Sequence, residues 1–368
     1  MTLATGAEDL LRLMLDGRPH TRPDLIELSG LARSTVVSRI DTLLATGLVV
    51  PIGEASSTGG RPPSRFALAP QSRFLLALDV GVRHLTVAVT DLLGTTVDIS
   101  TTAHDIDAGP RAVLGKAVRQ ARRLLKDRPL AGTGVGLPCP VDPETGRPNL
   151  GPIMPGWDNY DVAGRLSDEL GRPAYVDNDV NLMALGEHAA TYPTTNNLLF
   201  LKVSAGIGSG MIIGGRLQRG AQGLAGELGH ARTADGHDIV CRRCGNTGCL
   251  GTVASTVGIT AALEQQGIQG DLLDLARSGH PAALTAIRQA GREIGSVLAT
   301  CVNLLNPSVI VIGGSLAETG ETLISGIREN IYSRSLPLAT ANLRVTAVST
   351  PNAALKGAAT MVLQQLLA

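Results

Sequence analysis

Aromatic residues are scarce in this chain, at 2% of its 368 residues, with a single tryptophan. Apolar residues still make up 43%, so a sizeable core is available, but Leu, Val, Ile and Ala must build it. The length suffices for two or three domains of ordinary size. The composition therefore predicts a globular protein with aliphatic cores.

The chain also lacks net charge, because 32 basic residues balance 32 acidic ones. No global field draws it to nucleic acid or to a membrane surface, so any DNA contact must come from a local surface. No run approaches the roughly 20 apolar residues that a membrane span needs. Glu8 and Asp9 stand where a signal peptide would carry basic residues. We therefore expect a cytoplasmic protein without a membrane partner.

Cysteine is rare as well, yet three of the five cysteines lie in the stretch ELGHARTADGHDIVCRRCGNTGCL, from Glu227 to Leu250. They could bridge one another, hold a metal, or be free thiols brought together by chance. Cytoplasmic thiols stay reduced, which favours a metal over a disulfide. Three thiolates and an imidazole have the right number and softness for a structural, tetrahedral zinc site. The predicted ligands are His230, Cys241, Cys244 and Cys249, with His237 as a substitute.

The N-terminal part of the chain predicts a winged helix-turn-helix module. A helix-compatible segment over 24–28 is followed by a turn at 29–31 and a second helix over 33–45, whose apolar residues recur at three- and four-residue spacing. Two short strands, 48–52 and 65–68, flank a glycine-rich tip. The second helix would enter the major groove, and the tip would contact DNA as a wing. The predicted DNA-binding residues are Arg33, Ser34, Thr35, Ser38, Arg39 and Arg61.

A generic three-helix module for protein contacts would share part of this pattern. Through Arg73 the segment has eight Lys and Arg against seven Asp and Glu, so it is barely basic. The order of turn, polar helix face and arginine-bearing wing favours DNA binding. A dimer would bring two recognition helices to one operator and compensate for the modest charge of each.

After this DNA-binding domain over residues 1–70, two passages echo each other. They are FLLALDVGVRHLTVAVTDLLGTTVD from Phe74 and NLLFLKVSAGIGSGMIIGGRLQRG from Asn197. Each predicts an apolar strand, a turn, a second apolar strand and, after a glycine turn, a third strand. The repeat predicts a duplicated α/β domain over residues 71–368, with a cleft between two lobes. Glycine loops such as SAGIGSG could approach a phosphate or a sugar, or could merely connect strands.

The passages GVGLPCPVD, VDNDVN, GIGSGMIIGGRLQRGAQGLAGELGH, CGNTGCL and NPSVIVIGG, in this order, resemble the ROK family of repressors, open reading frames and sugar kinases. With the N-terminal module included, the chain is similar to the repressor branch, since the kinase branch generally lacks such a module. The resemblance implies an actin-like, ribonuclease-H-like sugar-kinase fold. It also implies that His230 binds zinc through one ring nitrogen while the other faces the sugar. The implied sugar-binding residues are Asn178, Asp179, Glu227 and His230.

The motif VDNDVN places Asn178 and Asp179 at the end of a predicted short strand, ahead of a helix, where α/β domains put ligand groups. In the kinases that the chain resembles, the asparagine holds the sugar and the aspartate removes a proton from the attacked hydroxyl. Asp179 thus has the position of a kinase base. The same residues could instead simply cap the helix.

The chain departs from the family pattern in three places. The first hairpin reads DVGVRH over 79–84, with Val82 where a second glycine would let the backbone approach the phosphates. Gly251 replaces a glutamate that touches the sugar in the family. Two residues separate Cys241 from Cys244 where the family has one, so Cys241 is the least secure ligand. The altered hairpin predicts a protein that is not an enzyme.

Together these features predict a sugar-responsive transcriptional regulator, most simply a repressor of carbohydrate uptake or metabolism genes. Its partners would be operator DNA, a small sugar or sugar-phosphate effector, and further copies of the chain in a dimer or tetramer. Two alternatives stay open. One is an ATP-dependent sugar kinase that could also regulate genes. The other is a regulator with a vestigial pocket that responds to a protein or a metabolic signal.

Overall fold

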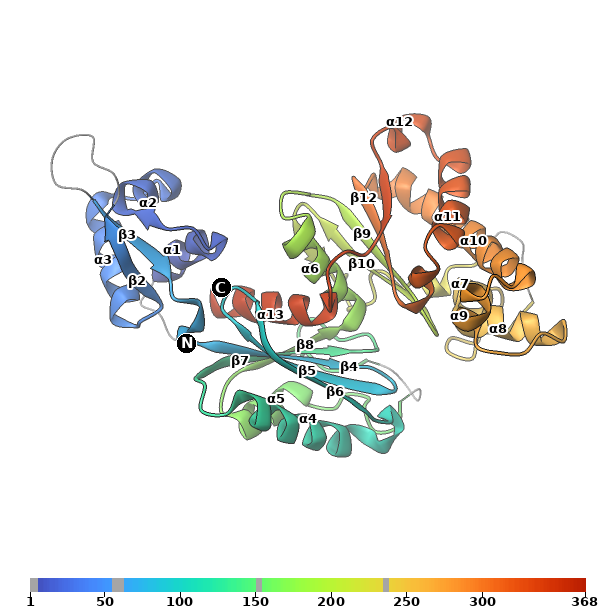
Figure 1. Ribbon diagram of the computed structural model, residues 1–368, viewed down its shortest axis with the longest axis horizontal. Helices are drawn as coiled ribbons and strands as arrows, with labels where there is room; N and C mark the ends of the chain where they lie inside the picture. The colour runs from blue at the N-terminus through green and yellow to red at the C-terminus, as the bar shows by residue number, and fades with distance from the viewer. Residues whose placement is uncertain (1–5, 55–62, 150–153, 234–237) are drawn as a thin grey trace. The chain divides into compact units, whose positions relative to one another are not determined.

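The computed structural model describes residues 6–54, 63–149, 154–233 and 238–368, and the chain divides into two compact units. Figure 1 labels most of the helices and strands of both units. Unit 1 comprises Met1–Gly136, Pro155–Val176 and Ala358–Ala368, and unit 2 comprises Leu137–Met154 and Asp177–Gly357. Among the described residues, no helix is both long and apolar enough to cross a membrane.

Unit 1 begins with the helix-turn-helix and hairpin that the sequence predicts. Its elements are α1 (Ala7–Leu13), β1 (His20–Thr21), α2 (Arg22–Ser29), α3 (Arg33–Ala45), β2 (Val49–Glu54) and β3 (Ser64–Leu68). Thr21 and Asp24 form a capping box that starts α2, since each side chain accepts a hydrogen bond from the other's backbone N–H. Gly30 ends α2 in the left-handed region and makes the turn to α3. The three strands form an antiparallel sheet in the order β1-β3-β2.

The helix α1, which the sequence analysis did not predict, contributes to the core of unit 1. Leu10 of α1 and Met14, which directly follows the helix, are fully buried and belong to the same apolar cluster as Ile40 of α3. That cluster also contains residues from distant parts of the unit, among them Val362 near the chain's end. The short apolar run in α1 thus becomes a helix because tertiary packing covers one of its faces.

Each unit contains a five-stranded mixed sheet, and the two sheets have the same topology. The strand order is β6-β5-β4-β7-β8 in unit 1 and β11-β10-β9-β12-β13 in unit 2. In both, the first three strands along the chain pair antiparallel, and the fourth pairs parallel with the first. This repeat confirms the duplication predicted from the two echoing passages.

The remaining elements are the strands of the two sheets and the helices that accompany them. Unit 1 contains β4 (Phe74–Val80), β5 (His84–Asp91), β6 (Thr96–Ala103), α4 (Gly109–Leu125), β7 (Leu130–Leu137), α5 (Val162–Leu170) and β8 (Ala174–Asn178), the last residues of β7 and β8 belonging to unit 2. Unit 2 contains α6 (Asp179–Thr191), β9 (Leu198–Val203), β10 (Ile207–Ile213), β11 (Arg216–Gln218), α7 (Leu250–Ala254), α8 (Thr256–Gln265), α9 (Leu272–Arg277), α10 (Pro281–Leu305), β12 (Val309–Gly313), α11 (Glu321–Arg334), α12 (Pro337–Thr340) and β13 (Arg344–Ala347). The last helix is α13 (Ala353–Leu366).

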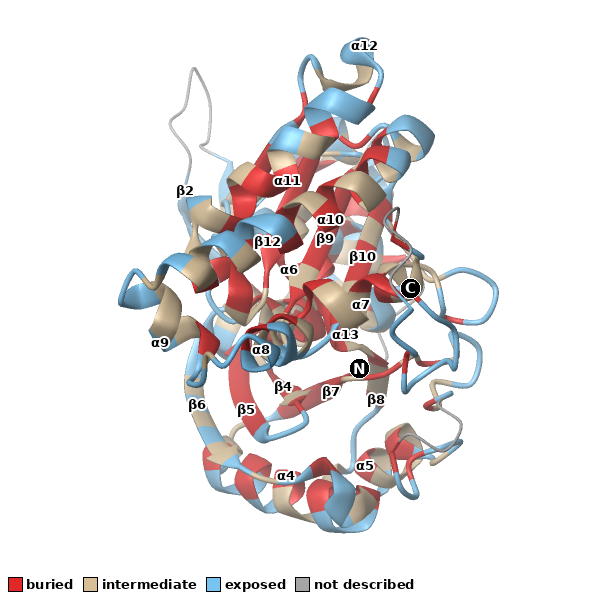
Figure 2. Ribbon diagram, turned by 90° about the vertical axis from the view of Figure 1, so that its right-hand side faces the viewer, coloured by how far each residue is buried: buried red, intermediate tan, exposed pale blue. Residues whose placement is uncertain are grey.

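Helices cover both faces of the unit 2 sheet, and this positions the candidate site. On one face Leu201 of β9 and Ile310 of β12 share a cluster with apolar residues of α10 and α11 such as Ile294. Figure 2 shows these buried strands with α10 and α11 over them. On the other face Phe200 packs with Ala184 of α6. The first turn of α6 is therefore held against β9, and it carries Asp179.

Candidate functional site

The four predicted metal ligands lie together in unit 2. One ligand atom from each of His230, Cys241, Cys244 and Cys249 lies within 4.8 Å of the other three. The Nδ1 atom of His230 is 3.7 Å from Sγ of Cys241, and Sγ of Cys244 is 3.5 Å from Sγ of Cys249. Cys241 thus joins the cluster in spite of its unusual spacing. The substitute ligand His237 lies outside the described residues.

The electrostatics of this cluster favour a bound cation. Burial and the neighbouring cysteines raise the pKa of Cys249 to about 12. Although burial opposes it, hydrogen bonds from the backbone N–H groups of Cys244 and Arg243 lower the pKa of Cys241. The two shifts differ in direction because a second thiolate beside the first is repelled. A divalent cation removes that repulsion, so the donor set fits a metal ion.

The segment that bears Glu227 and His230 is pressed against β10. A Cβ atom added at Gly229 would lie 2.2 Å from the carbonyl oxygen of Ile207. An isolated antiparallel β-bridge pairs Arg232, just after this segment, with the metal-ligand candidate Cys249. Only a glycine in this short 3-10 turn (Leu228–His230) lets the backbone approach the strand so closely.

His230 faces two partners with its two ring nitrogens. Nδ1 is directed at the cysteines, and Nε2 lies 3.9 Å from Oε2 of Glu227. Burial raises the pKa of Glu227, the charges of His230 and Arg243 lower it, and the charge of Asp179 raises it further. Asp179, Glu227 and His230 are therefore close enough to interact electrostatically within unit 2.

Asn178 is the N-cap of α6. Its Oδ1 accepts hydrogen bonds from the backbone N–H groups of Val180 and Asn181, at 2.9 and 3.2 Å, and its Nδ2 donates to the carbonyl of Cys139 at 3.0 Å. The helix begins at Asp179, directly after this cap. Asn178 thus caps the helix, which was the alternative to sugar binding. The second N–H of its side-chain amide remains available to a ligand. Sugar binding by Asn178 stays a prediction.

Two cations that pair with buried carboxylates were not predicted from the sequence. Nζ of Lys202 lies 2.5 Å from Oδ2 of Asp179, and Nε of Arg219 lies 2.7 Å from Oδ2 of Asp177. The aspartates are 5% and 2% exposed, and burial of such charges requires a partner. The sequence could have indicated one of these pairs, because Lys202 is the single charged residue in the apolar strand NLLFLKV. It lies on the face of the strand that packs against α6.

The turn between β4 and β5 is filled by an imidazole. Nε2 of His84 lies 3.2 Å from Oδ2 of Asp79, and a Cβ atom added at Gly81 would lie 2.1 Å from Cε1 of His84. The backbone N–H of Gly81 donates to the carbonyl of His84 at 2.9 Å, while Val82 is exposed. A phosphate-cradling loop needs open backbone N–H groups, and at Gly81 that group is already bonded.

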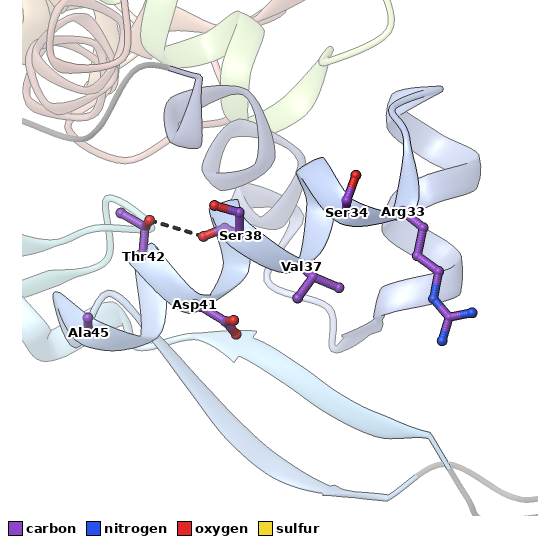
Figure 3. Close-up of a pocket in the computed structure, with 7 residues that line it drawn as sticks. All are labelled: Arg33, Ser34, Val37, Ser38, Asp41, Thr42 and Ala45. Atoms are coloured by element: carbon purple, nitrogen blue, oxygen red, sulfur yellow. Dashed lines mark hydrogen bonds between the residues drawn. The ribbon is translucent and has the colours of Figure 1, made fainter.

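Three of the six predicted DNA-binding residues lie on an open face of α3. Figure 3 shows the seven residues of this face. They are Arg33, Ser34, Val37, Ser38, Asp41, Thr42 and Ala45. Of the predicted set, Arg33, Ser34 and Ser38 are on this face, and Thr35 is half-buried beside it.

Arg39 is directed at α1 instead. Its Nη1 lies 3.1 Å from Oδ2 of Asp9, and its guanidinium fills the position where a Cβ at Gly6 would stand. The side chain of Arg39 is 21% exposed. To make its predicted contact with DNA, Arg39 would have to leave its ion pair with Asp9. Arg61 lies outside the described residues.

Comparison with known proteins identifies the family to which this chain belongs. The model of the ROK family matches residues 75–365. The chain belongs to the ROK family. The xylose repressor of Bacillus spizizenii is 29% identical over 340 residues, covering 89% of this chain and 86% of that protein. The crystal structure of a ROK family transcriptional regulator, a homologue of the E. coli MLC protein, has a TM-score of 0.84 at 26% identity and covers 98% of this chain and 96% of its own.

A sugar kinase is similar over less of the chain. The glucokinase of Halalkalibacterium halodurans is 29% identical over 292 residues, which cover 72% of this chain and 87% of the enzyme. The likeness to the ROK regulator is nearly complete and so extends into the N-terminal module.

Proposed function

We propose that this chain is a sugar-responsive transcriptional repressor that binds operator DNA through α3 and senses a small sugar in unit 2. The observation that carries the proposal is a helix-turn-helix with an open recognition face in the same chain as a ROK domain. Similarity to a xylose repressor and to a ROK transcriptional regulator along most of the chain supports it. Genome-wide capture of bound DNA tests it, and the promoters recovered would identify the genes and the sugar.

Residues 1–70 would form the DNA-binding domain, and residues 71–368 the domain that binds the effector and dimerises. Two copies of α3 on one dimer would read the two half-sites of an operator. A coupling free energy of about 1–3 kcal/mol between sugar and DNA binding would suffice for induction.

The cysteine-histidine cluster would hold structural zinc. Four protein ligands leave no open coordination position, which is the arrangement of structural rather than catalytic sites. If its Nδ1 held the metal, His230 would carry its proton on Nε2 and could donate a hydrogen bond toward Glu227 or a sugar hydroxyl. The carboxylates of Glu227 and Asp179 would accept hydrogen bonds from other hydroxyl groups.

We expect no sugar kinase activity from this chain. One carboxylate oxygen of Asp179, the residue at the kinase base position, already accepts a hydrogen bond from Lys202. In addition, His84 fills the turn that would cradle phosphate. Asp179→Asn should weaken sugar binding about tenfold, since it removes a charged hydrogen-bond acceptor. Because we expect no kinase activity in the natural protein, ADP release should stay at background in both proteins.

Calorimetry and a coupled ADP-release assay across pentoses, hexoses and amino sugars measure both effects. Asp168→Asn, which removes an exposed carboxylate from α5, is the matched control. Turnover in the natural protein that Asp179→Asn abolishes would establish the kinase alternative.

Asp9 competes with DNA phosphates for Arg39, so Asp9→Asn is expected to tighten DNA binding. An exposed ion pair is worth up to about 1 kcal/mol, which corresponds to an increase of about two- to fivefold in affinity. The increase should shrink in an Arg39→Ala background, because the guanidinium that Asp9 withholds is then missing. Fluorescence anisotropy with operator DNA measures all four combinations. An equal increase in both backgrounds would mean that Arg39 takes no part in DNA binding.

A further inference from the structure

The open face of α3 carries one acidic residue, Asp41. Its side chain is 58% exposed. DNA presents a dense array of phosphate charge, so a carboxylate on the approaching surface weakens binding unless it has a specific use. Asp41 lies on α3 two turns beyond Arg33, on the helix that the proposed function places in the major groove.

The carboxylate of Asp41 is held in place by Arg22. Nη2 of Arg22 lies 3.2 Å from Oδ1 of Asp41, and the guanidinium lies over the ring of Phe66 at 4.6 Å from its centroid. Phe66 belongs to β3 and is 3% exposed. A planar guanidinium stacked on a buried ring has little freedom. The first residue of α2 and a strand of the wing therefore orient a side chain of the recognition helix.

The ion pair with Arg22 leaves the second carboxylate oxygen of Asp41, Oδ2, able to accept a hydrogen bond. It engages Oδ1, whereas a carboxylate has lone pairs on both oxygens. Figure 3 shows Val37, Asp41 and Ala45 projecting from the same side of α3, one turn apart. Since the two flanking side chains are short and apolar, a base edge can approach Asp41 closely.

We propose that Asp41 is a specificity-determining residue, which accepts a hydrogen bond from the N4 amino group of a cytosine in each operator half-site. This inference rests on the proposed function as a DNA-binding repressor. In the major groove cytosine offers a donor, whereas guanine and thymine offer oxygen acceptors that repel a carboxylate. Adenine offers an amino group beside the acceptor N7, which disfavours a second acceptor. Arg22 orients the carboxylate and offsets part of its repulsion from the phosphates.

Selection from a randomised DNA library, followed by sequencing of the bound molecules, tests this role. The natural protein should select a half-site containing a constant cytosine. Asp41→Asn should change the preference at that position from cytosine to adenine, by about tenfold in relative affinity, because an amide both accepts and donates and so matches N6 and N7 of adenine. Arg22→Lys keeps the charge but loses the planar stack, and should broaden the preference at the same position.

Glu27→Gln is the matched control, since Glu27 is an exposed acidic residue of α2 outside the open face of α3. It removes the same charge, so it should change affinity without changing base preference. Asp41→Ser gives a second variant, and thermal unfolding followed by circular dichroism verifies that each protein is folded. Identical base preferences for the natural protein, Asp41→Asn and Asp41→Ser would overturn the inference. If the natural protein selected no sequence at all, the proposed function itself would fail.

Discussion

Replacing Cys249 with serine is expected to remove the metal and to lower effector affinity at least about tenfold. Cys249 is 1% exposed, and its Sγ contacts Sγ of Cys244 and the carbonyl of His230. Structural zinc contributes on the order of 10 kcal/mol in zinc-finger peptides, so losing one of four ligands should leave the site largely empty at ordinary zinc concentrations. The imidazole of His230 then loses its fixed orientation, and disturbing the orientation of metal ligands typically costs about 10–100-fold in metal affinity or activity.

Metal analysis of the reduced protein and calorimetry with a sugar panel measure the two losses. Cys301→Ser is the control, because Cys301 lies in α10 and is not one of the four clustered residues. It should keep one zinc per chain and full effector affinity. Stoichiometric zinc in Cys249→Ser would contradict the assignment of this ligand. Unchanged folding and ligand response after chelation would contradict the structural role of the metal.

Gly226→Ala is expected to destabilise unit 2 by several kcal/mol and to abolish sugar binding. Gly226 has φ of 98°, and a Cβ atom there would lie 2.1 Å from the carbonyl oxygen of Ser209. Its own carbonyl accepts hydrogen bonds from the backbone N–H and the hydroxyl of Ser209, at 2.9 and 2.8 Å. An alanine would combine a backbone strain of about 1–3 kcal/mol with a collision that must separate this segment from β10. Glu227, the next residue, would move away from Asp179.

Gly267→Ala separates the two contributions. Gly267 also has a positive φ, of 79°, but no atom lies within 4 Å of an added Cβ. It should therefore show the backbone strain alone and keep sugar binding. Urea unfolding and calorimetry make the comparison. Equal losses of stability in the two variants would show that the approach of Gly226 to Ser209 is unimportant.

Local patterns predicted much of the fold. The helix predicted over 33–45 matches α3 at both ends, because its apolar spacing and the glycine turn before it are local features. The two echoing passages predicted the two sheets, since alternation of strands and turns is visible within about 25 residues. The cysteine spacing likewise brought Cys241, Cys244 and Cys249 to one cluster.

Long-range pairs could not be predicted in this way. Lys202 and Asp179 are 23 residues apart, and Arg219 and Asp177 are 42 residues apart. Which charges meet depends on how α6 packs against β9 and on where the chain returns to the sheet. The sequence shows each charge but not its partner.

The sequence by itself determined the family and the four candidate metal ligands, because these motifs lie within short segments. Only the tertiary structure decided what individual side chains do. It placed Lys202 beside Asp179, the residue at the kinase base position, directed Arg39 toward Asp9, and oriented Asp41 through Arg22. The physical reason is that the strength and direction of an ion pair depend on distance and burial, which exist only once separate elements have packed together.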